Sequence, residues 1–241
     1  MTMLRDAGQT AWRSEAVRRR QHPPLDNFSA LAKPGRDEPA HRRIRRGEML
    51  FRAGDSFRSL HLVQLGFFKS FLSTEDGRSQ VTGFQMPGDL LGMDGIGIAE
   101  HTQTAVALDD SAVLVFPYAE FESPSTHANA LQGPLHRVMS QELARTHGMM
   151  ILLGTMHAEG RVAAFLLDLS QRYVVRGYSG CEFTLRMTRE DLASYLGLKL
   201  ETVSRIVSRF KVNGLIEAHN RDVRILDKVK LSELAGRTTT A

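Results

Sequence analysis

Residues 187–218 constrain the fold of this chain more than any other stretch. Thr188 is a favourable N-cap residue, and Asp191 stands three residues later, where it can bond back to the cap in an approximate capping box. Gly197 supplies a turn in which a left-handed backbone costs little. A second helix is predicted over residues 200–213. The stretch therefore predicts two short helices joined by a tight turn.

The second predicted helix has two faces of different chemistry. One face has apolar residues at the spacing of a side packed on a core: Val203, Ile206, Val207 and Phe210. The opposite face has polar residues at the same spacing: Glu201, Ser204, Arg205 and Ser208. Arginine can bind guanine through two hydrogen bonds, glutamate can accept one from cytosine, and serine can serve either base. A solvated amphipathic helix would have the same stripe, but the capped first helix and the glycine turn favour DNA recognition.

The motif Glu201-Thr202-Val203-Ser204-Arg205 in this setting resembles the recognition helix of the CRP/FNR superfamily of bacterial transcription regulators. Its E-x-x-S-R form is similar to the FNR and FixK branch, because the cAMP-receptor branch usually has glycine at the position of Ser204. The resemblance implies that Glu201, Ser204 and Arg205 read bases in a half-site of the type TTGAT.

Contacts to the DNA backbone are also implied. Arg189 and Thr202 match positions of the family that bind phosphates, and we expect further backbone contacts from Thr188, Lys199, Ser208 and Arg221. Lys199 departs from the family, which often has a serine or threonine cap there. The lysine either weakens the cap or adds a phosphate contact. Arg221 lies between two short predicted strands, in a hairpin wing whose tip would lie near the phosphates.

Charge is distributed unevenly along the 241 residues. From Arg161 onward there are 14 Lys and Arg against 9 Asp and Glu, a net charge of +5, and the preceding residues have 17 against 18, a net charge of −1. The positive excess thus lies with the predicted DNA-binding part, as phosphate neutralisation requires. The chain has no apolar run long enough to span a bilayer, no signal-peptide pattern and a single cysteine, so we expect a cytoplasmic protein without membrane contact.

The predicted fold class is α+β, with four consecutive parts. We expect a mobile N-terminal extension (1–40), a β-roll sensory domain (41–123), a dimerisation helix (124–158) and a winged helix-turn-helix DNA-binding domain (159–241). Short apolar segments separated by turns such as Asp76-Gly77 indicate the β-rich part. Gly54-Asp55 and the run from Pro87 to Gly92 resemble the β-roll of cyclic-nucleotide-binding domains.

The predicted dimerisation helix has an apolar stripe at approximately heptad spacing. Its members are Leu135, Met139, Leu143, Met149, Met150, Leu153 and Met156. Such a stripe is usually core, but this one would lie on a helix of some thirty residues between two domains. In the family this helix pairs with its copy, so we interpret the stripe as a homodimer seam.

The sequence lacks the residues that would bind cAMP, an iron–sulfur cluster or haem. The positions aligned with the cAMP pocket are 89–91 and 103–104, and they lack the arginine that would pair with the cyclic phosphate. An FNR-type iron–sulfur cluster needs four soft ligands, whereas the N-terminus has no cysteine and Leu114 stands where the β-roll ligand should be. The nine histidines form no recognisable haem motif. We therefore expect no cofactor and no metal.

The resemblance implies a sequence-specific activator of transcription that binds an inverted repeat of duplex DNA and recruits RNA polymerase. The β-roll loop near residues 75–80 matches a region that contacts RNA polymerase in the family. Two alternatives stay open: a regulator gated by an unidentified small ligand or haem in the β-roll, and a cyclic-nucleotide-type module that regulates another protein. An enzyme is not expected, because no catalytic triad, phosphate loop or metal-ligand spacing is present.

Cys181 suggests a redox switch. It lies within a few residues of Arg176 and Arg186, just before the DNA-binding helices, and cationic neighbours favour the reactive thiolate. Oxidation to a sulfinate would add negative charge beside the DNA phosphates and weaken binding. The alternative is a bystander cysteine, since Glu182 acts in the opposite direction. Peroxide treatment followed by a gel-shift assay on wild type and Cys181→Ser tests the hypothesis, and an equal loss in both would end it.

Overall fold

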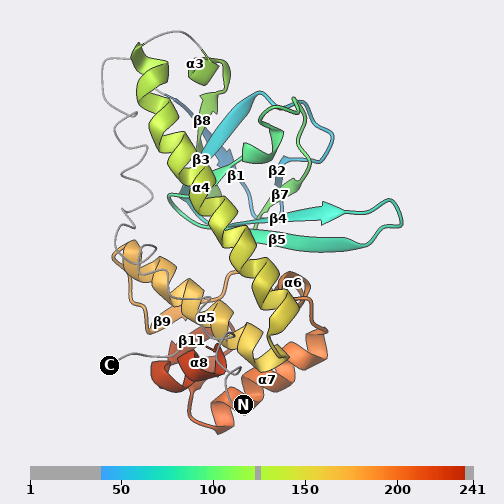
Figure 1. Cartoon of the computed structure of the whole chain (residues 1–241), viewed down its shortest axis with the longest axis vertical. Helices are drawn as coiled ribbons and strands as arrows, with labels where there is room; N and C mark the ends of the chain where they lie inside the picture. The colour runs from blue at the N-terminus through green and yellow to red at the C-terminus, as the bar shows by residue number, and fades with distance from the viewer. Residues whose placement is uncertain (1–38, 123–125, 237–241) are drawn as a thin grey trace, which may run out of the picture.

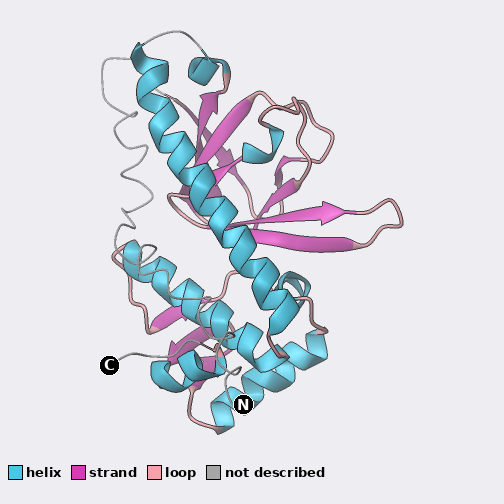
Figure 2. Cartoon of the chain, viewed as in Figure 1, coloured by secondary structure: helices cyan, strands magenta, loops and turns pink. Residues whose placement is uncertain are grey.

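The computed structural model of this chain describes residues 39–122 and 126–236. Figure 1 and Figure 2 show a β-rich N-terminal part, a long helix that descends from it, and a helical C-terminal part. The N-terminal elements are β1 (Ala40–Ile44), β2 (Met49–Phe51), β3 (Ser59–Leu65), β4 (Phe68–Ser73), β5 (Ser79–Gln85), β6 (Leu90–Leu91), the 3₁₀ helix η1 (Met93–Gly95), β7 (Thr104–Ala107), β8 (Ser111–Pro117) and α3 (Ala119–Glu122). The C-terminal elements are α4 (Thr126–Thr155), α5 (Ala158–Val175), β9 (Glu182–Thr184), α6 (Arg189–Leu196), α7 (Leu200–Val212), β10 (Ile216–His219), β11 (Asp222–Ile225) and α8 (Lys228–Leu234).

Two four-stranded antiparallel sheets form the N-terminal part, in the orders β1-β8-β3-β6 and β2-β7-β4-β5. Apolar side chains from both sheets share one core, which contains Ile44, Leu50, Phe51, Val63, Phe68, Leu91, Ala105, Ala107 and Val113. A second cluster lies on the first sheet and includes Phe121 of α3 and Leu135 of α4. The β-roll is therefore closed on one side by the start of the long helix.

The C-terminal part packs α5, α6, α7 and α8 around one apolar core, beside a three-stranded sheet in the order β10-β11-β9. Val81 and Phe84 of β5 belong to the same core. The Phe84 ring lies 6.0 Å from Phe165 of α5 and 5.1 Å from Tyr195 of α6, measured between centroids. The β-roll and the C-terminal part are thus packed against each other through β5.

The expected α+β architecture is confirmed, and the helix predicted over residues 200–213 is observed as α7 over Leu200–Val212. Two strands were not predicted. β1 has four exposed residues of five, and β6 is only two residues long, so neither shows a periodic pattern. The wing also has a third strand, because β9 pairs with β11. The predicted mobile extension lies outside the described residues up to position 38, as does the tail beyond residue 236.

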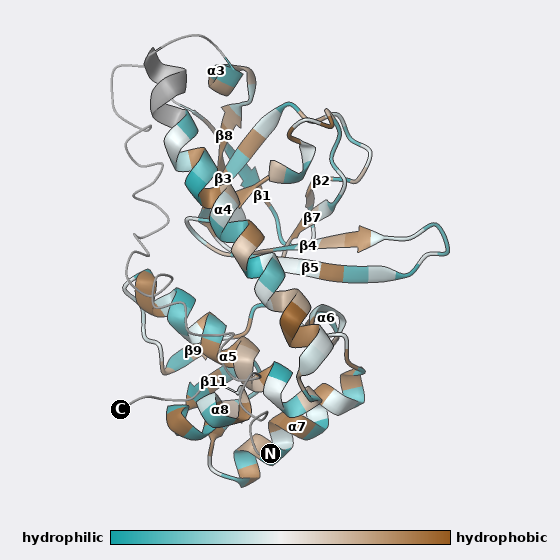
Figure 3. Cartoon of the chain, viewed as in Figure 1, coloured by the Kyte–Doolittle hydropathy of each residue, from teal (hydrophilic) through white to brown (hydrophobic). Residues whose placement is uncertain are grey.

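The structure divides the apolar stripe of α4 into two groups. Leu135 is buried against the β-roll, and Met149, Leu153 and Met156 pack against the C-terminal core of the same protomer. Met139, Leu143 and Met150 remain exposed, with exposed fractions of 37%, 57% and 66%. Figure 3 shows hydrophobic residues along the lower half of α4, near α6. Of the stripe residues, therefore, only the second group is exposed on the surface of the protomer, and Ile151 beside it is exposed as well.

Within the described ranges, no helix combines the length and the apolar character that a membrane crossing requires.

Candidate nucleic-acid interface

The capping box predicted at the start of α6 is confirmed. The amide of Asp191 donates to Thr188 Oγ1 over 3.0 Å, and the carboxylate of Asp191 accepts from the amide of Thr188 over 2.9 Å. Gly197 ends the helix in the left-handed region, with φ of 61° and ψ of 40°. Because both ends of α6 are defined by local bonds, the direction in which α7 leaves the turn is defined as well.

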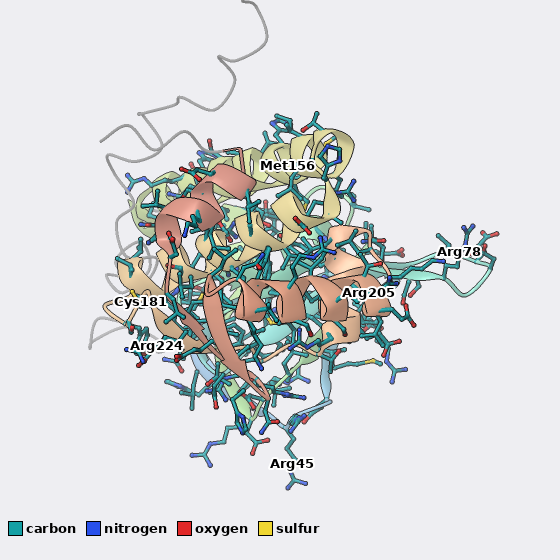
Figure 4. The ribbon with its side chains drawn as sticks, turned by 90° about the horizontal axis from the view of Figure 1, so that it is seen from below. Arg45, Arg78, Met156, Cys181, Arg205 and Arg224 are labelled. Carbon is teal, nitrogen blue, oxygen red and sulfur yellow. The ribbon has the colours of Figure 1, made fainter. Side chains whose placement is uncertain are left out.

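The two faces of α7 are also as predicted. Its apolar flank is buried in the C-terminal core, with Val203, Ile206, Val207 and Phe210 all at or below 5% exposure. On the other side Glu201, Arg205 and Ser208 are exposed and Ser204 is half-buried. In Figure 4, seen from below, α7 lies across the underside of the molecule and carries Arg205. The polar stripe is therefore presented to solvent.

The side chains expected to contact the DNA backbone differ in their surroundings. Lys199 occupies the N-cap of α7, is exposed and makes no side-chain cap bond, so the departure from a serine or threonine cap leaves this helix end uncapped by a side chain. Thr202 is half-buried beside it. Thr188 is exposed, and its hydroxyl donates to Asp191 over 2.7 Å while it accepts from the amide of that residue.

Arg189 is half-buried at the start of α6. Burial lowers the pKa of its guanidinium from the ordinary value. Its Nη1 is buried and has no hydrogen-bond partner in the part of the chain that the structure describes. A buried unpaired donor costs free energy, and a phosphate oxygen can supply the missing acceptor.

The wing is the hairpin of β10 and β11. Asn220 at its tip has a φ of 52°, which asparagine tolerates better than most residues, and His219 is exposed beside it. Arg221 is half-buried and its Nη1 donates to the carbonyl of Arg186 over 3.3 Å. This hydrogen bond to the loop before α6 was not predicted from the sequence, which indicated only a contact of Arg221 with the DNA backbone.

Cys181 is exposed, just before β9. The two arginines expected to act on its thiol have other partners: Arg176 binds Asp89, and Arg186 binds Asp109 of the β-roll over 2.9 Å. The cation on the paired strand is Arg224, which binds Glu182 over 3.1 Å. In Figure 4 Cys181 lies near Arg224, across the underside from Arg205. The redox switch stays a prediction, without the cationic neighbours first assumed for it.

Sequence reasoning missed a set of polar contacts that join α6 to the β-roll. Lys69 Nζ of β4 lies 2.5 Å from Asp191 Oδ1, and the amide of Val81 donates to Ser194 Oγ over 2.9 Å. Gln80 donates to the carbonyl of Ser194. Burial by itself would raise the pKa of Asp191, but the hydrogen bonds from Lys69 and Thr188 outweigh it and keep the pKa below its ordinary value of 3.8. No local periodicity could have shown these contacts, because their partners are over a hundred residues apart.

Comparison with known proteins gives two domain matches. Residues 41–123 match the cyclic nucleotide-binding domain, and residues 160–234 match the Crp-like helix-turn-helix domain.

Curated relatives span most of the chain. The transcriptional regulatory protein btr of Bordetella pertussis is 45% identical over 195 residues, 81% of each chain. The transcriptional activator protein FnrA of Stutzerimonas stutzeri is 41% identical over 212 residues, covering 88% of this chain and 84% of the relative. Among solved structures, FixK2 from Bradyrhizobium japonicum superposes with a TM-score of 0.75 at 27% identity, over 84% of this chain and 99% of FixK2.

Replacing Asp191 with asparagine tests the charge of the capping carboxylate. A carboxylate whose pKa is lowered in the folded state stabilises the fold above its ordinary pKa and loses that contribution as the pH falls through the lowered value. We expect Asp191→Asn to reduce the free energy of unfolding by about 1–3 kcal/mol at neutral pH, because the three hydrogen bonds that the carboxylate accepts from Lys69 and Thr188 are weakened. The difference from wild type should shrink as the pH falls below 3.8, the ordinary pKa of the carboxyl group. Urea unfolding followed by circular dichroism measures both, with the exposed Glu190→Gln as control. A difference that does not change with pH would contradict the prediction.

Proposed function

The chain belongs to the CRP/FNR family of transcription regulators, and on that premise we propose that it is an activator that binds a TTGAT-type inverted repeat as a homodimer and recruits RNA polymerase. It is a DNA-binding regulator and not an enzyme. The observation that supports binding to a specific inverted repeat is the polar face of α7, where Glu201, Ser204 and Arg205 lie opposite a buried apolar flank.

Base reading follows from the chemistry of that face. Arg205 suits a guanine, with two donors for O6 and N7, and Glu201 suits a cytosine, whose N4 amino group needs an acceptor. Ser204, with a short hydroxyl, suits a base edge close to the helix axis. We assign the reading of a TTGAT-type half-site to these three residues together.

Phosphate contacts position this face in the groove. We assign them to residues around α6 and α7 and on the wing, namely Thr188, Arg189, Lys199, Thr202, Ser208 and Arg221. Arg189 is the strongest of these assignments because its buried Nη1 lacks a partner in the described structure. The net charge of +5 from Arg161 onward supports the same orientation toward DNA.

The homodimer is assigned to the exposed side of α4. Met139, Leu143, Thr146 and Met150 recur at spacings of four, three and four residues, the pattern of a two-stranded helical seam. All four are exposed within the protomer. Large exposed apolar side chains in such a row indicate a surface that is covered by a partner.

Activation without a nucleotide is supported by the β-roll itself. At the positions aligned with the cyclic-phosphate site, Gln103 accepts from Thr82 Oγ1 over 2.6 Å and Thr104 accepts from the amide of Ala53 over 3.1 Å. The β4–β5 hairpin projects from the roll, and its exposed residues 75–80 are our assigned contact for RNA polymerase (Figure 1). A relative bearing the name transcriptional activator supports the direction of the effect.

Arg205→Ala tests the base-reading assignment. It should weaken binding to the inverted repeat by about 1–3 kcal/mol and relax selection at one base pair of each half-site.

Arg189→Ala should instead weaken binding to all sequences alike and reduce the slope of log K against log salt by about 1 per contact. Fluorescence anisotropy over a set of single-base variants, at several salt concentrations, measures both. A purified wild-type protein that binds every duplex with equal affinity would refute the proposed function.

Leu143→Glu tests the dimer seam. A carboxylate placed in an apolar seam is buried without a partner, so the dimer should dissociate and affinity for the inverted repeat should fall. Gln141→Glu is the matched control, because it adds the same charge two residues away on the outward side of α4. Analytical ultracentrifugation gives the oligomeric state. A dimeric Leu143→Glu protein would place the seam elsewhere.

A further inference from the structure

The turn between β5 and β6 is bound to the end of α5 by a buried carboxylate. Asp89 Oδ2 accepts from Arg172 Nη2 over 2.5 Å, and Asp89 Oδ1 accepts from Arg176 Nη2 over 2.6 Å. All three side chains are nearly buried, with exposed fractions of 10%, 11% and 5%. One acid of the β-roll thus binds two arginines of the DNA-binding part.

The same arginines also bind the backbone of the turn. Arg176 Nε donates to the carbonyl of Pro87 over 2.6 Å, and Arg172 Nη2 donates to the carbonyl of Phe84 over 2.8 Å. Asp89 additionally accepts from the amide of Met86 over 2.9 Å, which closes the turn on itself. We call these residues, Phe84, Met86, Pro87, Asp89, Arg172 and Arg176, the Asp89 cluster.

The turn that carries Asp89 is itself anchored in the β-roll. The amide of Gly88 donates to the carbonyl of Val63 on β3 over 2.8 Å, and the amide of Val63 donates to the carbonyl of Asp89 over 2.9 Å. The arginines are therefore bound to a part of the roll whose backbone is hydrogen-bonded into a central strand.

Electrostatics favours the docked arrangement. Burial by itself would raise the pKa of Asp89, but the charges of Arg172, Arg176 and Arg145 outweigh it and keep the pKa below its ordinary value. Arg145 lies on α4, so the long helix contributes to the same carboxylate. Removing the charge of Asp89 in the docked state would leave two nearly buried guanidinium groups without their counter-charge, which is strongly unfavourable.

The position of this contact along α5 determines how strongly it restrains the helix. Only two residues, Met156 and His157, separate the end of α4 from the start of α5. Arg172 is 14 residues into α5, about 20 Å from the helix start at 1.5 Å per residue. Figure 1 shows α5 leaving the lower end of α4 and running back beneath the roll. The Asp89 cluster therefore holds α5 at the end remote from the connection, where it best opposes rotation.

Docking leaves the reading face free. Glu201, Arg205 and Ser208 are exposed while the Asp89 cluster is formed, so the contact does not cover the DNA-binding surface. A contact of this kind sets where the recognition helix points and does not block it.

We propose that Asp89 is a positioning residue for DNA recognition, which orients α5 on the β-roll and thereby sets the separation of the two recognition helices in the dimer. This inference rests on the proposed homodimeric DNA binding. Two recognition helices must enter successive major grooves about 34 Å apart, so a loosely docked domain loses both affinity and selectivity for half-site spacing.

The test compares DNA duplexes that differ only in spacing. Wild type, Asp89→Asn and Arg176→Gln are titrated with the inverted repeat, with repeats lengthened or shortened by one and two base pairs, and with a single half-site. Asp89→Asn and Arg176→Gln should lose roughly ten- to hundredfold affinity on the best spacing and discriminate less among spacings, while binding to the half-site is unchanged. The matched control is Asp110→Asn, which neutralises an exposed acid of the β-roll whose carboxylate accepts from the amide of Arg46 over 3.0 Å.

Calorimetry supplies a readout that needs no DNA. Wild type should unfold in one transition that includes both parts of the chain, and Asp89→Asn in two, because the coupling between them is lost. Wild-type affinity and spacing preference in both variants would overturn the inference, as would a single unchanged transition in Asp89→Asn. If wild type bound no inverted repeat while the variant unfolded in two steps, the proposed function would fail and the docking role of Asp89 would stand.

Discussion

Burial of the apolar flank of α7 is the interaction on which the rest of this structure depends. A helix of 13 residues is marginal in isolation, and its stability comes from packing. Burying a side chain such as Val203 or Phe210 contributes about 1.5–3 kcal/mol, several times the effect of any helix propensity in the same segment. Since one side of the helix must face the core, the opposite side, with Glu201 and Arg205, must face outward. The exposed polar face, to which we assign base reading, is thus a consequence of the core.

The same division between apolar and polar contacts recurs where the β-roll meets the DNA-binding part. Val81 and Phe84 contribute buried area to the C-terminal core, and this area favours docking without specifying its direction. The Asp89 cluster and the Lys69–Asp191 pair add direction, because hydrogen bonds between charged groups require particular geometry. A β-roll whose polar groups bind the protein's own arginines is suited to a regulator whose domains are oriented by internal contacts.

Local features of the sequence were sufficient to predict much of the fold and part of the candidate nucleic-acid interface. The capping box of Thr188 and Asp191, the turn at Gly197 and the two faces of α7 involve residues no more than about seven positions apart, so their physics can be read along the chain. β1 was missed because its exposed charged residues resemble a loop, and it is a strand only because β8 pairs with it. The stripe of α4 was predicted as one seam, but Leu135 and Met149 turned out to pack within the protomer, since periodicity identifies an apolar side without naming what covers it.

By itself, then, the sequence determined the two helices and the tight turn of residues 188–212, the chemistry of the outward face of α7 and the order of most of the elements. Tertiary structure decided which charged side chains form ion pairs. Arg172 and Arg176 are 83 and 87 residues from Asp89, and Arg176 had been assigned to the neighbourhood of Cys181, which is near it in the chain. The reason is physical: helix caps and helix faces arise from interactions within a few residues, whereas an ion pair between domains forms only after two independently folded surfaces have packed, and nothing in the local pattern specifies which carboxylate a given arginine will meet.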